Sequence, residues 1–202
     1  MNKITTVIFD IGNVLAGFNW KSHIESKGFS EDINDQLGDI MFKSPLWRER
    51  DRGHKSEIEY KQMFIDEAPE LEYEINKVFE GIINLVEIYP FATEWVKSVK
   101  AQGKKVYVLS NYNKISFEND IHKFDFLNYI DGKLISYEVN HVKPEKEIYE
   151  ILLKKYNIVP NETVFLDDSK ENVDAASKLG IHAIHVTSHD KAVEELKRFE
   201  IY

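Results

Sequence analysis

The sequence predicts an α/β protein with a doubly wound, Rossmann-like parallel sheet and an inserted all-helical cap domain. Three short segments are apolar at consecutive positions: Thr5–Phe9, Lys105–Leu109 and Thr163–Leu166. Consecutive rather than alternating apolar residues are typical of strands that are covered on both faces. Helical patterns lie between the later segments, and alternation of strand and helix favours a parallel sheet.

The remaining elements follow from the spacing of apolar residues and from stop signals. A fourth strand is expected at Ala183–Val186. Helices are expected at Ala92–Gln102, at Pro144–Tyr156 with proline in its first turn, and from Lys170 to Leu179. Gly103 and Gly180 stand where the first and last of these helices should end.

The interval between the first two strands breaks this rhythm. It spans roughly ninety residues, whereas a strand-helix-strand crossover needs only about thirty. It is rich in acids and has helical periodicity without a convincing strand. The prediction is therefore an α/β core formed by residues 1–15 and 88–202, with residues 16–87 as the inserted helical cap.

Composition narrows the classes of partner. The chain has 202 residues, a formal net charge of −9, and lysines and arginines that are spread along the sequence. Nucleic acid is not expected as a partner, because such binders gather positive charge on one surface. There is no cysteine, and no apolar segment is long enough to cross a bilayer, so we expect a cytoplasmic protein without a membrane partner, monomeric or homodimeric.

Polar side chains follow the predicted strands at the edge where ligands bind in such sheets. Asp10 follows the first strand, Ser110 and Asn111 the second, and Asp167 and Asp168 the third. Lys143 lies in the loop before a predicted helix. Each residue alone is also typical of a cap, a turn or a surface, but their convergence at one edge indicates a site.

These residue types suit phosphoryl transfer. Crowded carboxylates repel one another unless a hard cation such as Mg²⁺ lies between them. The cation neutralises phosphate charge while a carboxylate, here Asp10, attacks phosphorus. A lysine and a hydroxyl would hold the phosphoryl oxygens. The expected ligand is a small phosphorylated substrate.

Four segments, FDIGNVL, VLSN, HVKPE and VFLDDSKENVDAA, resemble the motifs of the haloacid dehalogenase-like hydrolase superfamily. Response-regulator receivers share the chemistry, but their acidic pair comes first in the chain. The resemblance implies that Asp10 is the nucleophile and a magnesium ligand, with the Gly12 carbonyl, Asp168 and Asp167 as further ligands. Ser110, Asn111 and Lys143 would bind the phosphoryl group, and Lys143 would also steady the nucleophile.

The chain departs from the family pattern at Gly12, where phosphatases usually carry a second aspartate that acts as general acid and base. The FDIGNV form resembles a subgroup of bacterial α-glucose-1-phosphate phosphatases, which implies a sugar phosphate as substrate. Cap candidates for the proton donor are His23, His54 and Glu57. The segment WRERDRG (Trp47–Gly53) resembles the substrate-facing end of a helix in that subgroup. Arg50 and Arg52 are therefore expected either to reach toward the substrate or to form surface ion pairs.

Three other functions stay open at this point. A 2-haloacid dehalogenase would use the same aspartate but no metal, which the acidic pair argues against. A mutase needs the acid-base group that Gly12 lacks. A catalytically weak binding protein for a phosphorylated ligand would explain Gly12, but it would not need a nucleophile. We therefore expect a phosphoric monoester hydrolase that acts through an aspartyl-phosphate.

Overall fold

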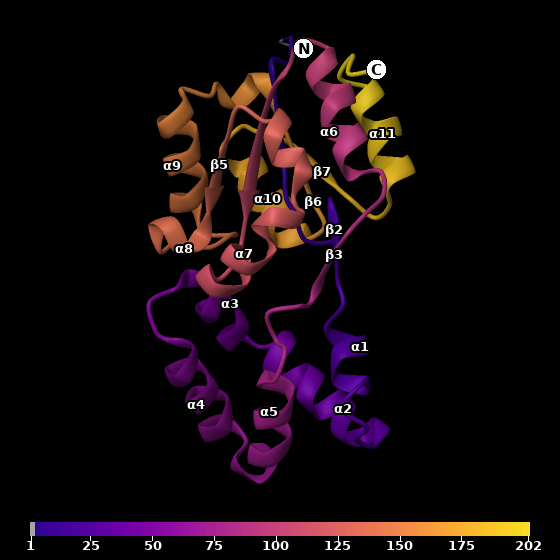
Figure 1. Ribbon diagram of the computed structural model, residues 1–202. Helices are drawn as coiled ribbons and strands as arrows, with labels where there is room; N and C mark the ends of the chain where they lie inside the picture. The colour runs from indigo at the N-terminus through magenta and orange to yellow at the C-terminus, as the bar shows by residue number, and fades with distance from the viewer. Residues whose placement is uncertain (1–2) are drawn as a thin grey trace.

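A central parallel sheet organises the larger part of the molecule (Figure 1). The computed structural model describes residues 3–202. Its strands occur in the order β5-β4-β1-β6-β7, and every neighbouring pair is parallel. The strands are β1 (Thr6–Phe9), β4 (Lys105–Ser110), β5 (Gly132–Ile135), β6 (Thr163–Asp167) and β7 (His182–His185).

Apolar side chains of β1 alternate between two hydrophobic clusters on opposite faces of the sheet. Val7 and Phe9 belong to one cluster, with residues of α6 and α11, whereas Ile8 belongs to the other, with residues of α9 and α10. Coverage of both faces is the reason that these strands are apolar at every position. The helices of this part are α6 (Ala92–Ala101), α7 (Lys114–Asp120), α8 (Ser136–Val139), α9 (Lys146–Tyr156), α10 (Lys170–Lys178) and α11 (His189–Lys197), with 3₁₀ turns at Ile121–Lys123, Asp125–Tyr129 and Pro160–Glu162.

A helical insert lies between two short strands, β2 (Ala16–Phe18) and β3 (Val86–Ile88), which pair antiparallel. The insert has its own hydrophobic cluster, which includes Phe64 and Ile75. In Figure 1 the insert lies below the sheet, on the side of the carboxyl ends of the strands. Its elements are α1 (Trp20–Glu25), α2 (Glu31–Leu37), a π-helical turn (Gly38–Phe42), α3 (Pro45–Arg52), α4 (Glu57–Glu67), a 3₁₀ turn (Pro69–Leu71) and α5 (Glu72–Phe79).

The predicted fold class is confirmed, and the differences concern weak elements. The three central strands agree with the prediction to within a residue, and the fourth begins one residue earlier than expected. The helix expected to start at Pro144 starts at Lys146, because Glu145 is its extended N-cap residue. Strands β2, β3 and β5 were not predicted. The boundaries of the cap domain stay a prediction.

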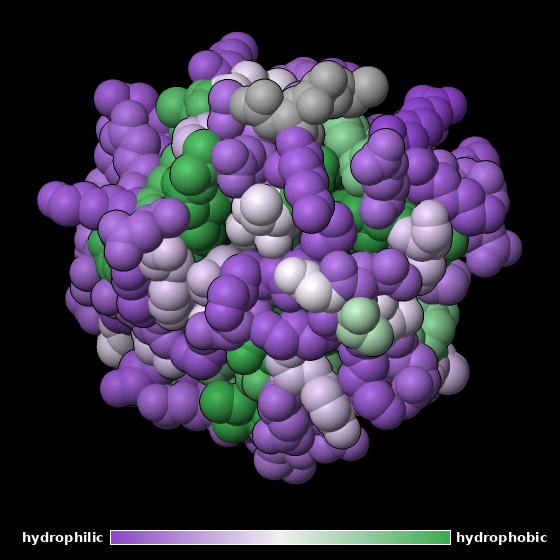
Figure 2. Space-filling model, turned by 90° about the horizontal axis from the view of Figure 1, so that it is seen from above, coloured by the Kyte–Doolittle hydropathy of each residue, from purple (hydrophilic) through white to green (hydrophobic). Residues whose placement is uncertain are grey.

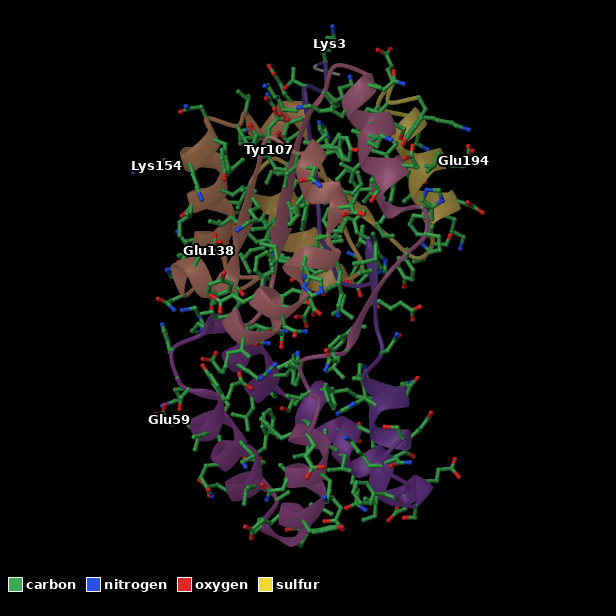
Figure 3. The ribbon with its side chains drawn as sticks, in the orientation of Figure 1. Lys3, Glu59, Tyr107, Glu138, Lys154 and Glu194 are labelled. Carbon is green, nitrogen blue, oxygen red and sulfur yellow. The ribbon has the colours of Figure 1, made fainter. Side chains whose placement is uncertain are left out.

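One face of the core lies on the side away from the insert. Seen from above, the face opposite the insert is mostly hydrophilic, with scattered apolar side chains (Figure 2). Figure 3 shows Glu59 at the outer edge of the insert, where it completes a capping box with Ser56 at the start of α4. Within residues 3–202, no helix combines the length and apolarity that a membrane crossing requires.

Candidate active site

Asp10 stands directly after β1, the middle strand of the sheet. The strands that follow β4 and β6 in the chain, β5 and β7, lie on opposite sides of β1. In such sheets, ligands bind at the carboxyl ends of the strands where the strand order reverses in this way. Asp10 is 6% exposed, and its Oδ1 accepts a hydrogen bond from the Ile11 amide at 2.7 Å. Burial raises the pKa of the Asp10 carboxyl, and Asp167 and Asp168 raise it further, against the lowering effect of Lys143. Asp10 is thus a buried acid in a crowded negative site.

Lys143 supplies the positive charge at the centre of this site. Its Nζ lies 2.8 Å from Asp10 Oδ1 and 2.6 Å from Asp167 Oδ2, and the residue is 1% exposed. Burial alone would lower the pKa of Lys143, but the two carboxylates outweigh burial and hold the pKa above its usual value. The ammonium group is therefore charged and held beside the predicted nucleophile.

Asn111 positions this lysine through the backbone. Its Oδ1 accepts from the Lys143 amide at 2.8 Å, and its Nδ2 donates to the Lys143 carbonyl at 3.0 Å. Both ends of the Asn111 amide are thus engaged. Ser110, the last residue of β4, is 2% exposed and lies at the same edge of the sheet. The predicted phosphate-binding roles of these two residues stay predictions, and the geometry gives Asn111 a clear positioning role.

The acidic pair divides into a buried and an accessible member. Asp167 is fully buried, and its Oδ1 accepts from the Ser169 amide at 2.8 Å and from Asn172 Nδ2 at 2.9 Å. Asp168 Oδ2 accepts from Asn13 Nδ2 at 2.8 Å. Burial raises the pKa of Asp168. Asp167 is therefore saturated with donors, whereas Asp168 lines the cavity described below.

The donor set suits a hard divalent cation. Carboxylate oxygens of Asp10, Asp167 and Asp168 lie within 4.8 Å of one another, and Lys143 balances only part of their charge. Mg²⁺ prefers oxygen ligands and usually takes one or two carboxylates. Asp10 and Asp168, together with the backbone of Gly12, face the cavity and are the residues placed to hold the ion.

The turn after Asp10 has its left-handed residue at Asn13 and not at Gly12. The φ of Asn13 is 52°. Asparagine tolerates this region better than most residues. A Cβ added at Gly12 would meet nothing within 4 Å. Asn13 was missed by the sequence analysis, although it fixes the carboxylate of Asp168.

A cavity of about 150 Å³ lies next to Asp10, between the sheet and the insert. Its floor contains the acids and its distal wall is largely apolar. Side chains of Tyr112, Asn113, Ser116 and Asp120 form a polar flank contributed by the core. The remaining lining residues, apart from the floor group Asp10, Gly12, Asn13, Asn111 and Asp168, come from the insert and its connecting strands: Phe18, Trp47, Asp51, Ile82, Ile83, Leu85 and Val86.

Both arginines of the WRERDRG segment are engaged in ion pairs. Arg50 is 1% exposed, and its guanidinium donates to Glu57 Oε2 at 2.8 Å. The Cζ atom of Arg50 also lies over the Trp47 ring, 4.8 Å from the ring centroid. Arg52 pairs with Glu49 at 2.9 Å and with Glu145 of the core at 2.6 Å. Arg52 therefore ties the insert to the core.

The three cap candidates for a proton donor lie away from the cavity lining. His23 Nε2 is 2.7 Å from the Val78 carbonyl, His54 is exposed, and Glu57 is paired with Arg50. In contrast, Asp51 is one of the residues that line the cavity, and the residue is 8% exposed. Its position among alternating charges in the sequence carried no signal of burial.

A parallel α/β sheet with an aspartate after its middle strand, a buried lysine and an acidic pair is the arrangement that the sequence predicts for a hydrolase with a carboxylate nucleophile. The model of the haloacid dehalogenase-like hydrolase family matches residues 4–180. The chain therefore belongs to the haloacid dehalogenase-like hydrolase family.

Three relatives illustrate the similarity. The sesquiterpene phosphatase astK of Aspergillus oryzae is 28% identical, covering 95% of this chain and 94% of its own. The D-ribitol-5-phosphate phosphatase of Bacteroides thetaiotaomicron is 26% identical, covering 88% and 89%. A solved HAD family enzyme of that bacterium, in complex with magnesium and inorganic phosphate, has a TM-score of 0.68 and 22% identity, over 92% and 96% of the two chains.

These matches confirm the predicted family and the predicted enzyme class, a phosphoric monoester hydrolase. The solved relative shares the fold of this chain, and the ion that it binds is the cofactor predicted from the sequence.

Proposed function

We propose that the protein is a Mg²⁺-dependent phosphatase that hydrolyses a small phosphomonoester through an aspartyl-phosphate on Asp10. The observation that carries the proposal is the position of Asp10 on the floor of the cavity, with Lys143 Nζ at 2.8 Å and Asp168 beside it. A metal-independent dehalogenase has no need of this acidic group. A binding protein has no need of a nucleophile.

The residues of the chain divide the work of the first step. Asp10 and Asp168, with the Gly12 carbonyl, would hold Mg²⁺, which neutralises charge on the phosphate when bound. Lys143 keeps Asp10 oriented through the 2.8 Å contact and presents positive charge to the phosphoryl oxygens. Asp167 and Asn111 in turn hold Lys143 in place. Asp10 then attacks phosphorus, and the alcohol departs into the cavity.

The leading substrate class is a small sugar phosphate, with glucose 1-phosphate as the predicted example. The cavity is lined by polar residues such as Asn113 and Ser116 and by the aromatic residues Phe18 and Trp47. A sugar presents hydroxyls on its edges and C–H groups on its faces, which fits this pairing. The activity of the D-ribitol-5-phosphate phosphatase also supports a polyol or sugar phosphate.

The distal wall favours a second candidate, a phosphomonoester with an apolar alcohol. Ile82, Ile83, Leu85 and Val86 line this wall in succession along the chain. Such a wall gains free energy by burying hydrocarbon and offers no hydrogen bonds to a hydroxyl. The sesquiterpene phosphatase relative supports the same direction.

The test measures phosphate release with and without Mg²⁺ from para-nitrophenyl phosphate, glucose 1-phosphate, glucose 6-phosphate, ribitol 5-phosphate and hexyl phosphate. Metal-dependent turnover that favours one of the sugar or polyol esters supports the leading candidate. A preference for hexyl phosphate supports the second. No turnover of any ester by folded protein would refute the phosphatase proposal and favour the binding protein.

The assembly and location of the enzyme stay proposals. We infer a cytoplasmic monomer or homodimer that acts on a small solute. The spread of charge in the sequence supports a small ligand rather than a nucleic acid.

A further inference from the structure

The proposed phosphatase reaction leaves one proton without a source, and the inference below rests on that proposed function. An alkyl alcohol leaves phosphorus slowly unless an acid protonates its oxygen, and such catalysis is typically worth about 10²- to 10⁴-fold. Gly12 has no side chain to provide this proton. Another acid must therefore reach the leaving group from elsewhere in the cavity.

Asp51 is the acid of the insert that reaches this cavity. It lies in the last turn of α3 and lines the same cavity as Asp10 and Gly12. Trp47, one helical turn earlier, also lines the cavity, so this face of α3 is directed at the space above the nucleophile. The residue is 8% exposed, which is unusual for an aspartate.

The backbone at Asp51 is fixed by the core. The Ser136 hydroxyl donates to the Asp51 carbonyl at 2.6 Å and also contacts the Tyr112 carbonyl at 3.2 Å. The adjacent Arg52 is paired with Glu145 of the core at 2.6 Å. These contacts fix the position of Asp51 relative to the sheet, and a proton donor needs such a fixed position.

The other carboxyl groups of the cavity are already engaged. Asp120 accepts from the Tyr112 hydroxyl at 2.6 Å and from Lys123 Nζ at 2.6 Å. Asp168 accepts from Asn13 and belongs to the cation site. Asp10 is the nucleophile. Asp51, which is hydrogen-bonded with Asn113, is the carboxyl in the cavity lining that has neither a lysine partner nor a place in the cation site.

The surroundings of Asp51 raise the pKa of its carboxyl to near neutral pH. Burial raises the pKa of Asp51 to about 7, Arg50 and hydrogen bonds with Asn113 lower it, and Glu57 raises it. Tyr112 also faces Asp51, as a neutral phenol whose own pKa is raised by burial. A general acid works best when its pKa lies near the working pH, and Asp51 meets this condition.

We propose that Asp51 is the general acid and base that replaces the carboxyl missing at Gly12. In the first step, an Asp10 oxygen bonds to phosphorus, the bond between phosphorus and the leaving oxygen breaks, and that oxygen takes the proton of Asp51. In the second step, the Asp51 carboxylate takes a proton from water as the water oxygen bonds to phosphorus and the bond between phosphorus and the Asp10 oxygen breaks. Inorganic phosphate is released, Asp10 is again a carboxylate, and Asp51 is again protonated.

The test compares two esters of nearly equal shape in the Mg²⁺-loaded enzyme. Para-nitrophenyl phosphate has a good leaving group, and 4-nitrobenzyl phosphate, one methylene longer, has a poor one. Single-turnover rates with enzyme in excess isolate the transfer to Asp10. In Asp51→Asn, we expect the nitrobenzyl rate to fall about 10²- to 10⁴-fold, with the nitrophenyl rate within about threefold of wild type.

A second readout follows from the base role. With excess para-nitrophenyl phosphate, Asp51→Asn should release a burst of about one nitrophenolate per site and then turn over slowly, because water is no longer activated. His54→Asn is the matched control, since His54 is an exposed residue three positions along the same segment. It should change neither rate. Asp51→Ser provides a second variant should the first fail to fold.

The outcomes separate this inference from the proposed function. Equal losses with both esters, or no loss with either, would overturn the role of Asp51 while wild-type turnover leaves the phosphatase proposal intact. Absence of Mg²⁺-dependent release from both esters in the wild-type protein would instead overturn the proposed function itself.

Discussion

Replacement of Lys143 by methionine tests whether this side chain holds the acidic site together. Lys143 is buried and lies 2.8 Å from Asp10 and 2.6 Å from Asp167. Removal of one partner of a buried ion pair typically costs about 3–5 kcal/mol, because the remaining charge is left unpaired. Two carboxylates are left here, so Lys143→Met should lose at least that much in metal-free protein at pH 8. For a chain of this size, the melting temperature should fall by about 6–20 °C.

The effect should depend on pH with a defined sign. Without Lys143, the pKa of Asp10 loses the influence that lowers it, so the carboxyl takes up a proton more readily. The deficit in the free energy of unfolding should therefore shrink from pH 8 to pH 5. Urea denaturation at both pH values, followed by circular dichroism, measures the difference.

Two further variants make the result interpretable. Adding Asp10→Asn to Lys143→Met should recover more than about 1 kcal/mol, because a neutral amide replaces one unpaired charge. Lys197→Met removes a surface lysine paired with Glu194 and should cost less than about 1 kcal/mol. If Lys143→Met lowers the free energy of unfolding by less than about 1 kcal/mol, or by the same amount at pH 5 and pH 8, the reasoning is refuted.

Three other predictions concern the acids. Asp10→Asn should abolish phosphate release while circular dichroism and the melting temperature show an intact fold, and full activity would exclude Asp10 as nucleophile. Burial raises the pKa of Asp51 from 3.8 to about 7, so its contribution to stability falls as pH rises across that window. Asp51→Asn should remove up to about 4 kcal/mol of this pH dependence in urea titrations. Gly12→Asp should fold normally, because a Cβ there meets nothing within 4 Å, and should restore nitrobenzyl phosphate cleavage to Asp51→Asn at least about tenfold.

Four strands of the central sheet could be predicted because each has a recognisable run of apolar residues in its sequence. The residues of β1 are buried on both faces, so every position is apolar and the acid after it stands out. Strand β5 lies at an edge of the sheet, with its first two residues only half-buried, and its sequence GKLI has no comparable run. Strands β2 and β3 have three residues each. Tertiary pairing, rather than local pattern, makes these segments strands.

The site residues that follow the strands could also be predicted from the sequence, whereas the residues that the insert contributes to the cavity could not. Strand ends place Asp10, Asp167 and Asp168 at one edge, and the structure brings them within 4.8 Å. Asp51 lies among the alternating charges of WRERDRG, which are typical of an exposed helix. Its backbone carbonyl accepts a hydrogen bond from Ser136, which is 85 residues away in the chain. No spacing rule reports such a contact, and for this reason His23, His54 and Glu57 were the candidates instead.

The position of Trp47 and Asp51 on successive turns of α3 affects how the substrate range of this enzyme can change. The same short segment forms part of the wall that faces the alcohol and, on our proposal, delivers its proton. An exchange of the insert with that of a relative would therefore replace substrate recognition and the proposed acid-base group together. A chimera that received a foreign insert would need Gly12→Asp as well, and grafts that preserve α3 should keep their catalytic rate while other insert helices are varied.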